Sequence, residues 1–260
     1  MKTLVLYVFH QYNDRVAYFL YASIFEDPNI DFLIICNNIY LNLNLNLPSY
    51  VKILKRQNIG FDFGGWSEGL LTNDLYKNYD NFIFANSSIL GPFLPSYYIG
   101  KWTDIYINGL KNNIKLFGST INTFYDIVNR SHVQSYIFST DKEALQYLID
   151  CEIFSLTNIM HNFMDAVNNK EILMSRKIIE KGWNIGCLHS YYKDVDFTFK
   201  TKKPEEYNLK VVADLMNKLF YDTHNINVLE LVFIKGNRFI PTKYPIERII
   251  WDDKIGYKIT

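Results

Sequence analysis

The segment Asn58-Ile-Gly-Phe-Asp-Phe-Gly-Gly-Trp66 decides the fold class of this chain. It follows Val51 to Leu54, a short run of β-branched and apolar residues typical of a buried strand, and Trp66 to Leu75 then has helical spacing. The order of strand, glycine-rich loop and helix is that of a nucleotide site in an α/β protein. The glycines do not form the dinucleotide fingerprint, and no Lys-Ser or Lys-Thr follows to make a P-loop. A plain strand-to-helix turn with Asp62 as its cap is an equally good interpretation of the segment alone.

Strand and helix patterns on both sides extend this unit. Leu4 to Phe9, Asp31 to Cys36 and Asn81 to Ala85 are apolar runs suited to buried strands. Asp14 to Phe25, between the first two runs, has helical spacing. This alternation predicts an α/β fold with a central mixed, mostly parallel sheet flanked by helices. No linker rich in Pro, Gly or Ser divides the chain, so we expect a single domain over residues 1–260.

The second half has weaker patterns. Val133 to Phe138 is predicted as a strand, and Thr140 and Glu143 as the capping box of the next helix. Glu205 to Phe220 is amphipathic and predicts a helix. Val228 to Ile234 is apolar throughout and predicts a last strand.

Composition excludes several classes of protein. The 27 basic and 27 acidic side chains cancel, so the chain lacks the positive charge of a nucleic-acid-binding protein. No run approaches the roughly 18 to 20 apolar residues of a membrane span, and the first residues carry no secretory cleavage site. Cys36, Cys151 and Cys187 are far apart and lack metal spacing, which predicts reduced thiols and a cytoplasmic location.

Two polar segments follow strands, where open α/β sheets bind their ligands. In the first, the Asp62 carboxylate and the Asn58 amide can accept hydrogen bonds from a uracil or a ribose, while Gly60 and Gly64 allow a ligand to approach the backbone. We therefore expect these four residues in a nucleotide site.

The second polar segment is Asn86-Ser87-Ser88, which leads into Gly91-Pro92. Amide and hydroxyl oxygens can hold Mg²⁺ or Mn²⁺, although more weakly than carboxylates do. The segment is thus a candidate for a metal held by Asn86 and Ser88, and a simple Asx or Ser turn is the alternative.

Glu171 is a candidate general base at the start of a predicted helix. Asn168 or Asn169 would cap this helix, so the Glu171 carboxylate would gain from the helix dipole whether or not it has a function. His132 and Gln134 begin a predicted strand and are candidates to contact phosphate or acceptor. The other four histidines have no pattern that assigns them a role, and no hydrolytic triad is indicated.

Five segments taken together resemble a glycosyltransferase group related to the rhamnan synthesis protein F family, over roughly residues 1 to 240. Similar chains occur in algae, fungi and large DNA viruses, and for a viral chain the location would be the host cytoplasm. The segments are Asn58 to Trp66, Phe82-Ile-Phe-Ala-Asn-Ser-Ser-Ile-Leu-Gly-Pro-Phe-Leu-Pro95, Leu116-Phe-Gly-Ser-Thr120, His132-Val-Gln-Ser135 and Glu171-Ile-Leu-Met-Ser-Arg176.

The resemblance implies a fold of the GT-A type, a Rossmann-like sheet that binds a nucleoside diphosphate sugar. Residues 1–125 would form the donor half and residues 126–260 the acceptor half. The implied activity is transfer of the sugar, with inversion, to a glycan or another hydroxyl acceptor, in which Glu171 takes the acceptor proton. Arg176 or Lys235 would stabilise the leaving diphosphate.

The Asn86 to Ser88 turn would match the metal and diphosphate turn of this fold, which usually carries carboxylates. The missing carboxylates leave open whether Mn²⁺ or Mg²⁺ is used. They also leave open a non-catalytic module that holds a nucleotide sugar or glycan. A nucleotidyltransferase is a further alternative, although only Lys55 and Arg56 stand near the glycine-rich loop.

Overall fold

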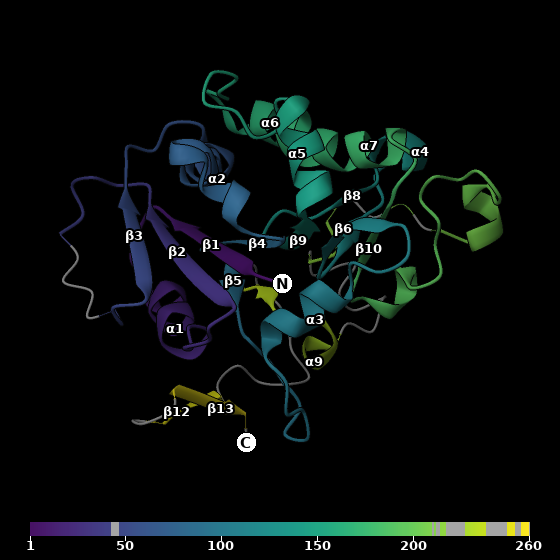
Figure 1. Cartoon of the computed structure of the whole chain (residues 1–260). Coiled ribbons are helices and arrows are strands. Elements are labelled where there is room, and N and C mark those ends of the chain that lie inside the picture. Colours follow the sequence, from purple (N-terminus) through teal and green to yellow (C-terminus); the bar gives the residue numbers. More distant parts are fainter. Residues whose placement is uncertain are drawn as a thin grey trace.

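The computed structural model describes residues 1–42, 47–209, 211, 214–216 and 227–237, together with the backbone of 249–252 and 256–259. Its centre is a seven-stranded sheet in the order β10-β6-β9-β4-β1-β2-β3 (Figure 1). Neighbouring strands are parallel except at β9, which runs antiparallel to both β4 and β6. The strands are β1 (Thr3–Phe9), β2 (Ile30–Cys36), β3 (Val51–Lys55), β4 (Asn81–Asn86), β6 (Ile114–Gly118), β9 (Ile137–Asp141) and β10 (Asn184–Cys187).

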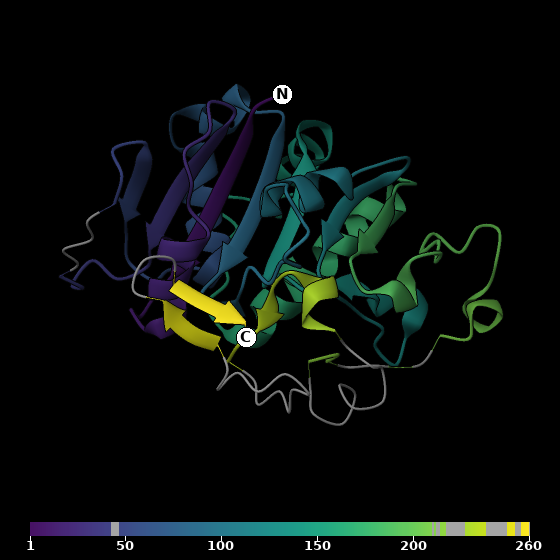
Figure 2. The same ribbon diagram turned by 90° about the horizontal axis from the view of Figure 1, so that it is seen from below.

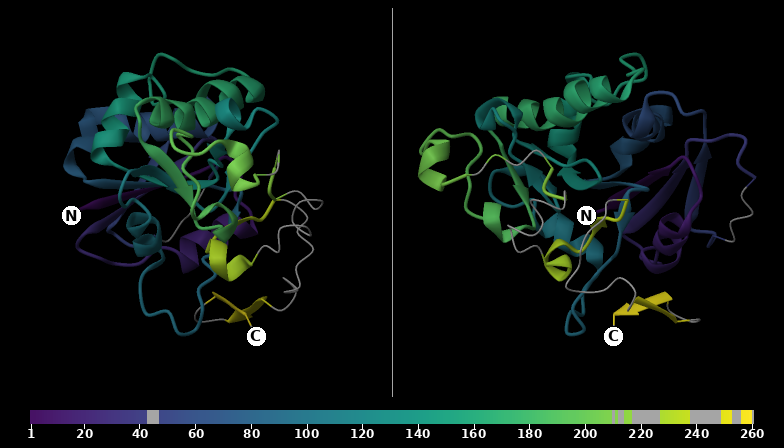
Figure 3. Two further views of the ribbon diagram at one scale, coloured as in Figure 1. Left: turned by 90° about the vertical axis from the view of Figure 1, so that its right-hand side faces the viewer. Right: turned by 180° about the vertical axis from the view of Figure 1, so that it is seen from behind.

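Helices cover both faces of this sheet, which confirms the predicted α/β fold (Figures 1 and 3). Helices α2, α5 and α7 lie on one face, and α1 and α3 on the other. The helices are α1 (Asp14–Ala22), α2 (Phe61–Leu71), α3 (Trp102–Asn108), α4 (Ile127–Arg130), α5 (Lys142–Asp150), α6 (Phe163–Ala166), α7 (Leu173–Glu180) and α9 (Val228–Leu231), with 3₁₀ turns at Thr72–Asn78, Ser190–Tyr192 and Pro204–Tyr207.

Three two-stranded ribbons complete the described part of the chain. The pairs are β5 (Ile89–Leu90) with β11 (Ile234–Lys235), β7 (Ile121–Asn122) with β8 (His132–Val133), and β12 (Ile249–Asp252) with β13 (Gly256–Ile259). Figure 2 shows the last ribbon beside α1.

Strands β1, β2 and β4 are apolar at nearly every position because both of their faces are buried. Along β1, Leu4, Leu6 and Val8 join the core beneath α2, whereas Val5, Tyr7 and Phe9 join the core beneath α1. All six side chains are at most 1% exposed. This explains why the strands read as continuous apolar runs instead of alternating ones.

One helix begins much earlier than predicted. The cap expected at Asn168 or Asn169 is wrong, because helical structure starts at Phe163, where Asn162 caps the first turn. The helix then passes through a π-helical segment, Val167–Ile172, before it continues as α7. An extra residue in one turn rotates every later side chain about the helix axis, so this segment fixes which residues face the sheet.

The predicted capping box and strand near residue 140 also differ from the structure. The segment from Val133 to Phe138 is divided between β8 and β9. Thr140 lies inside β9, and the cap of α5 is Asp141, whose carboxylate accepts from the N–H of Ala144 at 2.9 Å. Strand and helix thus meet one residue later than the capping pattern indicates.

The C-terminal predictions are wrong where they can be compared. Val228 to Ile234 is not one strand, because α9 occupies its first four residues and Val232 leaves the helix with φ of 61°. Of the predicted helix from Glu205 to Phe220, the start is a 3₁₀ turn, and residues 210, 212–213 and 217–220 lie outside the described residues.

Gly64 is required where α2 packs against the loop before it. A Cβ atom at Gly64 would lie 2.1 Å from the backbone oxygen of Ile59. One at Gly69 would instead meet side-chain ends, those of Leu33, Ile35 and Leu6, at 2.9, 3.0 and 3.5 Å. Backbone cannot yield as a side chain can.

We therefore expect Gly64→Ala to lower the free energy of unfolding by about 1–3 kcal/mol, the usual cost of overpacking. Gly69→Ala is the matched control in the same helix, and its gain in helix propensity of up to about 1 kcal/mol offsets its mild crowding. Urea denaturation compares the two variants. Equal stability of the variants would contradict the close backbone approach.

Candidate functional site

A pocket of about 240 Å³ opens at the carboxyl ends of β1, β2 and β4, where an open α/β sheet binds ligands. Its walls come from both halves of the chain. The first turn of α2 faces α6 and the π-helical segment Val167–Ile172 that follows it. The lining residues are His10, Asn37, Asn58, Phe61, Asp62, Phe63, Ser87, Ser135, Phe163, Ala166, Val167 and Glu171.

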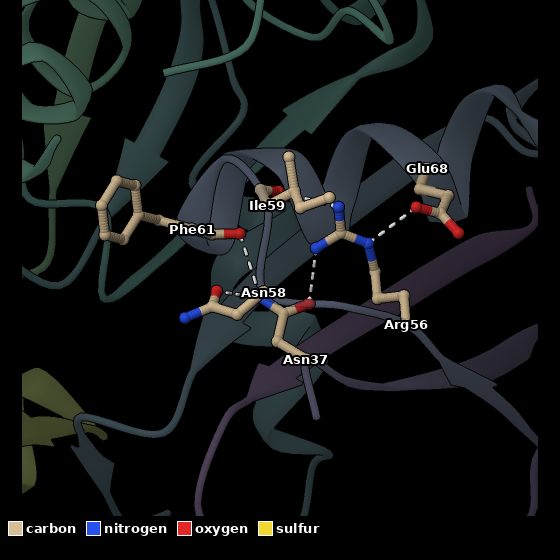
Figure 4. A network of polar contacts seen from close by, with 6 residues as sticks. All are labelled: Asn37, Arg56, Asn58, Ile59, Phe61 and Glu68. Carbon is tan, nitrogen blue, oxygen red and sulfur yellow. Dashed lines mark hydrogen bonds and ion pairs between the residues drawn. The ribbon is translucent and has the colours of Figure 1, made fainter. Parts of the chain in front are cut away.

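A buried arginine holds one wall of the pocket together (Figure 4). Arg56 follows β3, and its guanidinium donates to Asn37 Oδ1, to the backbone oxygen of Ile59 and to Glu68 Oε2, at 2.8, 2.8 and 2.7 Å. Because the planar guanidinium has donors in fixed directions, these bonds set β2, the loop and α2 relative to one another. Arg56 does not line the pocket and its guanidinium is held by these partners within the fold, so it does not supply the basic side chain that a nucleotidyltransferase would need beside its triphosphate.

The first turn of α2 is reached through two left-handed residues. Gly60 has φ of 77° and Phe61 has φ of 55°, a conformation that is uncommon for a residue with a side chain. The amide of Asn37 donates to the Phe61 backbone oxygen at 3.0 Å and lies 3.4 Å from Asn58 Oδ1. The Arg56 network thus holds the strained turn that aims Asp62 at the pocket.

Asp62 is a carboxylate in an environment that disfavours its charge. Burial, and to a smaller degree the nearby Glu171 carboxylate, raise the pKa of Asp62 from 3.8 to about 6, although Asn86 opposes this by donating to Asp62 Oδ2 at 2.8 Å. The pocket therefore contains two carboxyl groups close enough to influence each other, and Asp62 gains its proton near pH 6.

Glu171 lies in the π-helical segment, about two turns after the helix begins. The interpretation of Glu171 as a residue of a first helical turn, stabilised by the helix dipole, is therefore wrong. Its Oε1 accepts from the backbone N–H of Ser135 at 2.8 Å, which fixes the carboxylate between the helix and the β8–β9 connection. One hydrogen bond leaves further lone pairs on Glu171 to accept a proton or a hydroxyl from a ligand.

The Asn86 to Ser88 turn lies at the pocket, but its side chains are used within the fold. Asn86 Oδ1 accepts from the Ser88 N–H at 2.9 Å and its amide donates to Asp62, while Ser88 Oγ accepts from the Asn237 amide at 3.5 Å. No group of three His, Cys, Asp or Glu side chains in the described residues is arranged to hold a metal ion. Because Asn86 and Ser88 use their polar atoms within the fold, the two side chains do not fit a divalent metal ion. Metal use by the protein stays a prediction, and we derive no chemical step through a metal.

Two basic residues stand beside this turn. Arg15 of α1 donates from Nε to the Ser87 backbone oxygen at 3.1 Å, and Lys235 is paired with Ile89 in the β5–β11 ribbon. Arg15 was not identified from the sequence because it belongs to a helix far away in the chain, and no local pattern marks it.

Several predicted site residues do not line the pocket. His132 is 4% exposed, and burial lowers its pKa below 6.5 even though the Glu171 carboxylate raises it. Gln134 is 2% exposed and bonds to Thr120 and Asp214 within the protein.

Arg176 also lies outside the lining residues. It donates from Nη1 to the backbone oxygen of Val128 at 2.6 Å. Gly60 lies in the turn before Asp62 and Gly64 in the first turn of α2, and neither glycine lines the pocket. The pocket thus unites Asn58, Asp62, Ser87 and Glu171 of the predicted residues, with Asn86 directly behind Asp62.

His10, Asn37 and Ser135 line the pocket and were missed as site residues. His10 and Asn37 each come directly after a buried strand, and this position is the signal that sequence reasoning could have used. Ser135 contributes its backbone N–H, which no residue pattern reveals.

Asp62→Asn is expected to stabilise the protein above pH 6. A raised folded-state pKa means that the ionised Asp62 destabilises the fold at high pH, and that this cost disappears as pH falls through about 6 towards 3.8. The variant should therefore have the higher melting temperature at pH 8, and the two proteins should converge near pH 4.

Asp31→Asn is the control of opposite sign for the same thermal scans. Although burial raises the pKa of Asp31, its bonds to Lys2 and Tyr79 hold it below 3.8 overall, so this variant should be less stable at pH 8. A lower melting temperature of Asp62→Asn at pH 8 would contradict the raised pKa.

Comparison with known proteins identifies a family for the chain. No curated protein matches the chain. A solved structure titled "Crystal Structure of A197 from STIV" covers 56% of this chain and 68% of its own, at 11% identity and a TM-score of 0.32, which is too remote to support an argument. Within the described residues, no helix combines the length and the apolar character needed to cross a membrane.

The family comparison covers most of the chain. The model of the family described as "Rhamnan synthesis protein F" matches residues 32–252, which include all but one of the lining residues of the pocket. The chain belongs to the rhamnan synthesis protein F family.

Proposed function

We propose that this protein is a glycosyltransferase that moves a sugar from a nucleoside diphosphate sugar to a hydroxyl of a glycan or similar acceptor. Membership of a family named for rhamnan synthesis supports a glycosyltransferase-type activity in polysaccharide synthesis. The observation that carries the proposal is the pocket at the strand ends, in which the Glu171 carboxylate faces the loop of Asn58 and Asp62.

Glu171 acts as the general base of this reaction. An acceptor hydroxyl gives its proton to Glu171 as the hydroxyl oxygen attacks the anomeric carbon from the side opposite the diphosphate, so the configuration inverts. The Ser135 N–H holds Oε1, which keeps the carboxylate in one orientation during the attack. Such positioning supplies part of the rate enhancement because the reacting groups need no further ordering.

The donor lies along the β1–β2–β4 side of the pocket. Asn58 and Asp62 offer acceptors to the hydroxyls of the ribose or the transferred sugar, and Ser87 offers a hydroxyl near the diphosphate. Residues 126–260 provide the acceptor side through Ser135, Phe163 and Glu171. This division of the chain into a donor half and an acceptor half is part of the proposal.

Glu171→Gln is expected to abolish transfer while nucleotide binding is unchanged. Glutamine can still accept from the Ser135 N–H but cannot take a proton, so turnover should fall by roughly 10²–10⁴-fold, the usual contribution of a general base. Release of nucleoside diphosphate from a panel of nucleotide sugars, with a glycan mixture as acceptor, measures turnover, and calorimetry measures binding.

Glu180→Gln is the matched control, since Glu180 is on the same helix and pairs only with the surface residue Lys177 in the described structure. Each assay runs with Mn²⁺ and with a chelator, which tests the metal prediction separately. Full turnover by Glu171→Gln would refute the role of Glu171. A wild-type protein that binds nucleotide sugars yet never releases product would instead support the non-catalytic module.

A further inference from the structure

His10 stands at the mouth of the pocket, directly after β1 ends. It is exposed to solvent, and it shares the pocket with Ser87, Asp62 and Glu171. An exposed histidine usually has no fixed orientation, but this one is held by the backbone.

The ring of His10 is oriented by Asn37. Nδ1 lies 2.8 Å from the Asn37 backbone oxygen, which can only accept, so Nδ1 carries a hydrogen and donates it. Asn37 itself is fixed, because its N–H donates to the Phe9 backbone oxygen at 2.7 Å and its side chain accepts from Arg56 (Figure 4). With Nδ1 used as a donor, Nε2 is the nitrogen of His10 that is available to a ligand, and it donates a hydrogen bond when the ring is protonated on both nitrogens.

The charges of the pocket show why such a group is needed. Asp62 and Glu171 are acidic, and none of the lining residues is a lysine or an arginine. Arg15 does not line the pocket, and its guanidinium donates to the backbone oxygen of Ser87. A diphosphate in this pocket would face two carboxyl groups, and His10 is the lining side chain that can carry a positive charge.

We propose that His10 is a catalytic residue that, as an imidazolium, donates a hydrogen bond from Nε2 to the diphosphate of the donor and stabilises it as the leaving group. This inference rests on the proposed function. In the reaction, a bond forms between the acceptor oxygen and the anomeric carbon. The bond from that carbon to the diphosphate oxygen breaks, and this oxygen keeps the electron pair. Glu171 takes the acceptor proton, and His10 keeps its own proton and supplies a charge-assisted hydrogen bond.

His10→Ala and His10→Gln test this role through binding, before any acceptor is known. Calorimetry compares UDP, dTDP, GDP, CDP and ADP with the corresponding nucleosides. A hydrogen bond to a charged group contributes about 1.5–3 kcal/mol, so the nucleoside diphosphate that binds the wild type should bind His10→Ala roughly 10- to 100-fold more weakly. The affinity for the nucleoside alone should not change.

His161→Gln is the control, because His161 is an exposed histidine that does not line the pocket. The two His10 variants should unfold at the wild-type temperature, since the side chain is on the surface. If a nucleoside diphosphate binds the wild type and both His10 variants equally well, His10 has no contact with the phosphates and the inference is wrong. If no nucleoside diphosphate binds the wild type, the proposed function fails instead.

Discussion

Arg56 places a buried positive charge between three segments of the chain, and its hydrogen bonds form only when all three are in position. The side chain is 7% exposed, and its carboxylate partner, Glu68, is 37% exposed. A buried guanidinium without its partners would be costly, because the charge loses its contact with water and gains nothing in return. The end of β2, the loop after β3 and the helix α2 are therefore fixed relative to one another by one side chain.

The geometry of the pocket follows from this constraint. Asn37, which Arg56 holds, donates to the backbone of Phe61 and accepts from His10 through its carbonyl. The left-handed turn at Gly60 and Phe61 is thus maintained by tertiary hydrogen bonds and not by local preference. One buried cation in this way determines the direction of two groups that line the pocket, the Asp62 carboxyl and the His10 ring.

The opposite wall is built by a different device. The π-helical segment Val167–Ile172 carries Glu171, and the buried Lys170 beside it donates to the backbone oxygen of Glu152 at 2.6 Å. Burial lowers the pKa of Lys170 to about 8. The extra residue in this turn and the lysine contact turn one face of the helix to the sheet, so that Glu171 reaches the Ser135 N–H. Glu171 and His10 thus line one pocket from opposite halves of the chain, and the described lining of this pocket has no lysine or arginine.

The sequence by itself determined the central strands of the sheet and the place of the glycine-rich loop that carries Asn58 and Asp62. Strands that are buried on both faces must be apolar at nearly every position, and such runs can be recognised in a sequence. Three runs show this pattern: Leu4 to Phe9, Asp31 to Cys36 and Asn81 to Ala85. The strand, glycine loop and helix around Asn58 to Trp66 likewise indicated a ligand site, since local order in the chain determines this unit.

Only the tertiary structure decided the start of the helix that carries Glu171, the contacts of His132, Gln134 and Arg176, and the inclusion of His10 in the pocket. Short helices and two-residue strands gain little from local preference, so contacts with distant segments decide between them, as at Val228 to Ile234. A hydrogen bond such as that from His10 to Asn37 joins strand ends that the fold brings together. Residue type and spacing along the chain do not show that His10 and Asn37 come close together, because the fold alone brings these strand ends side by side.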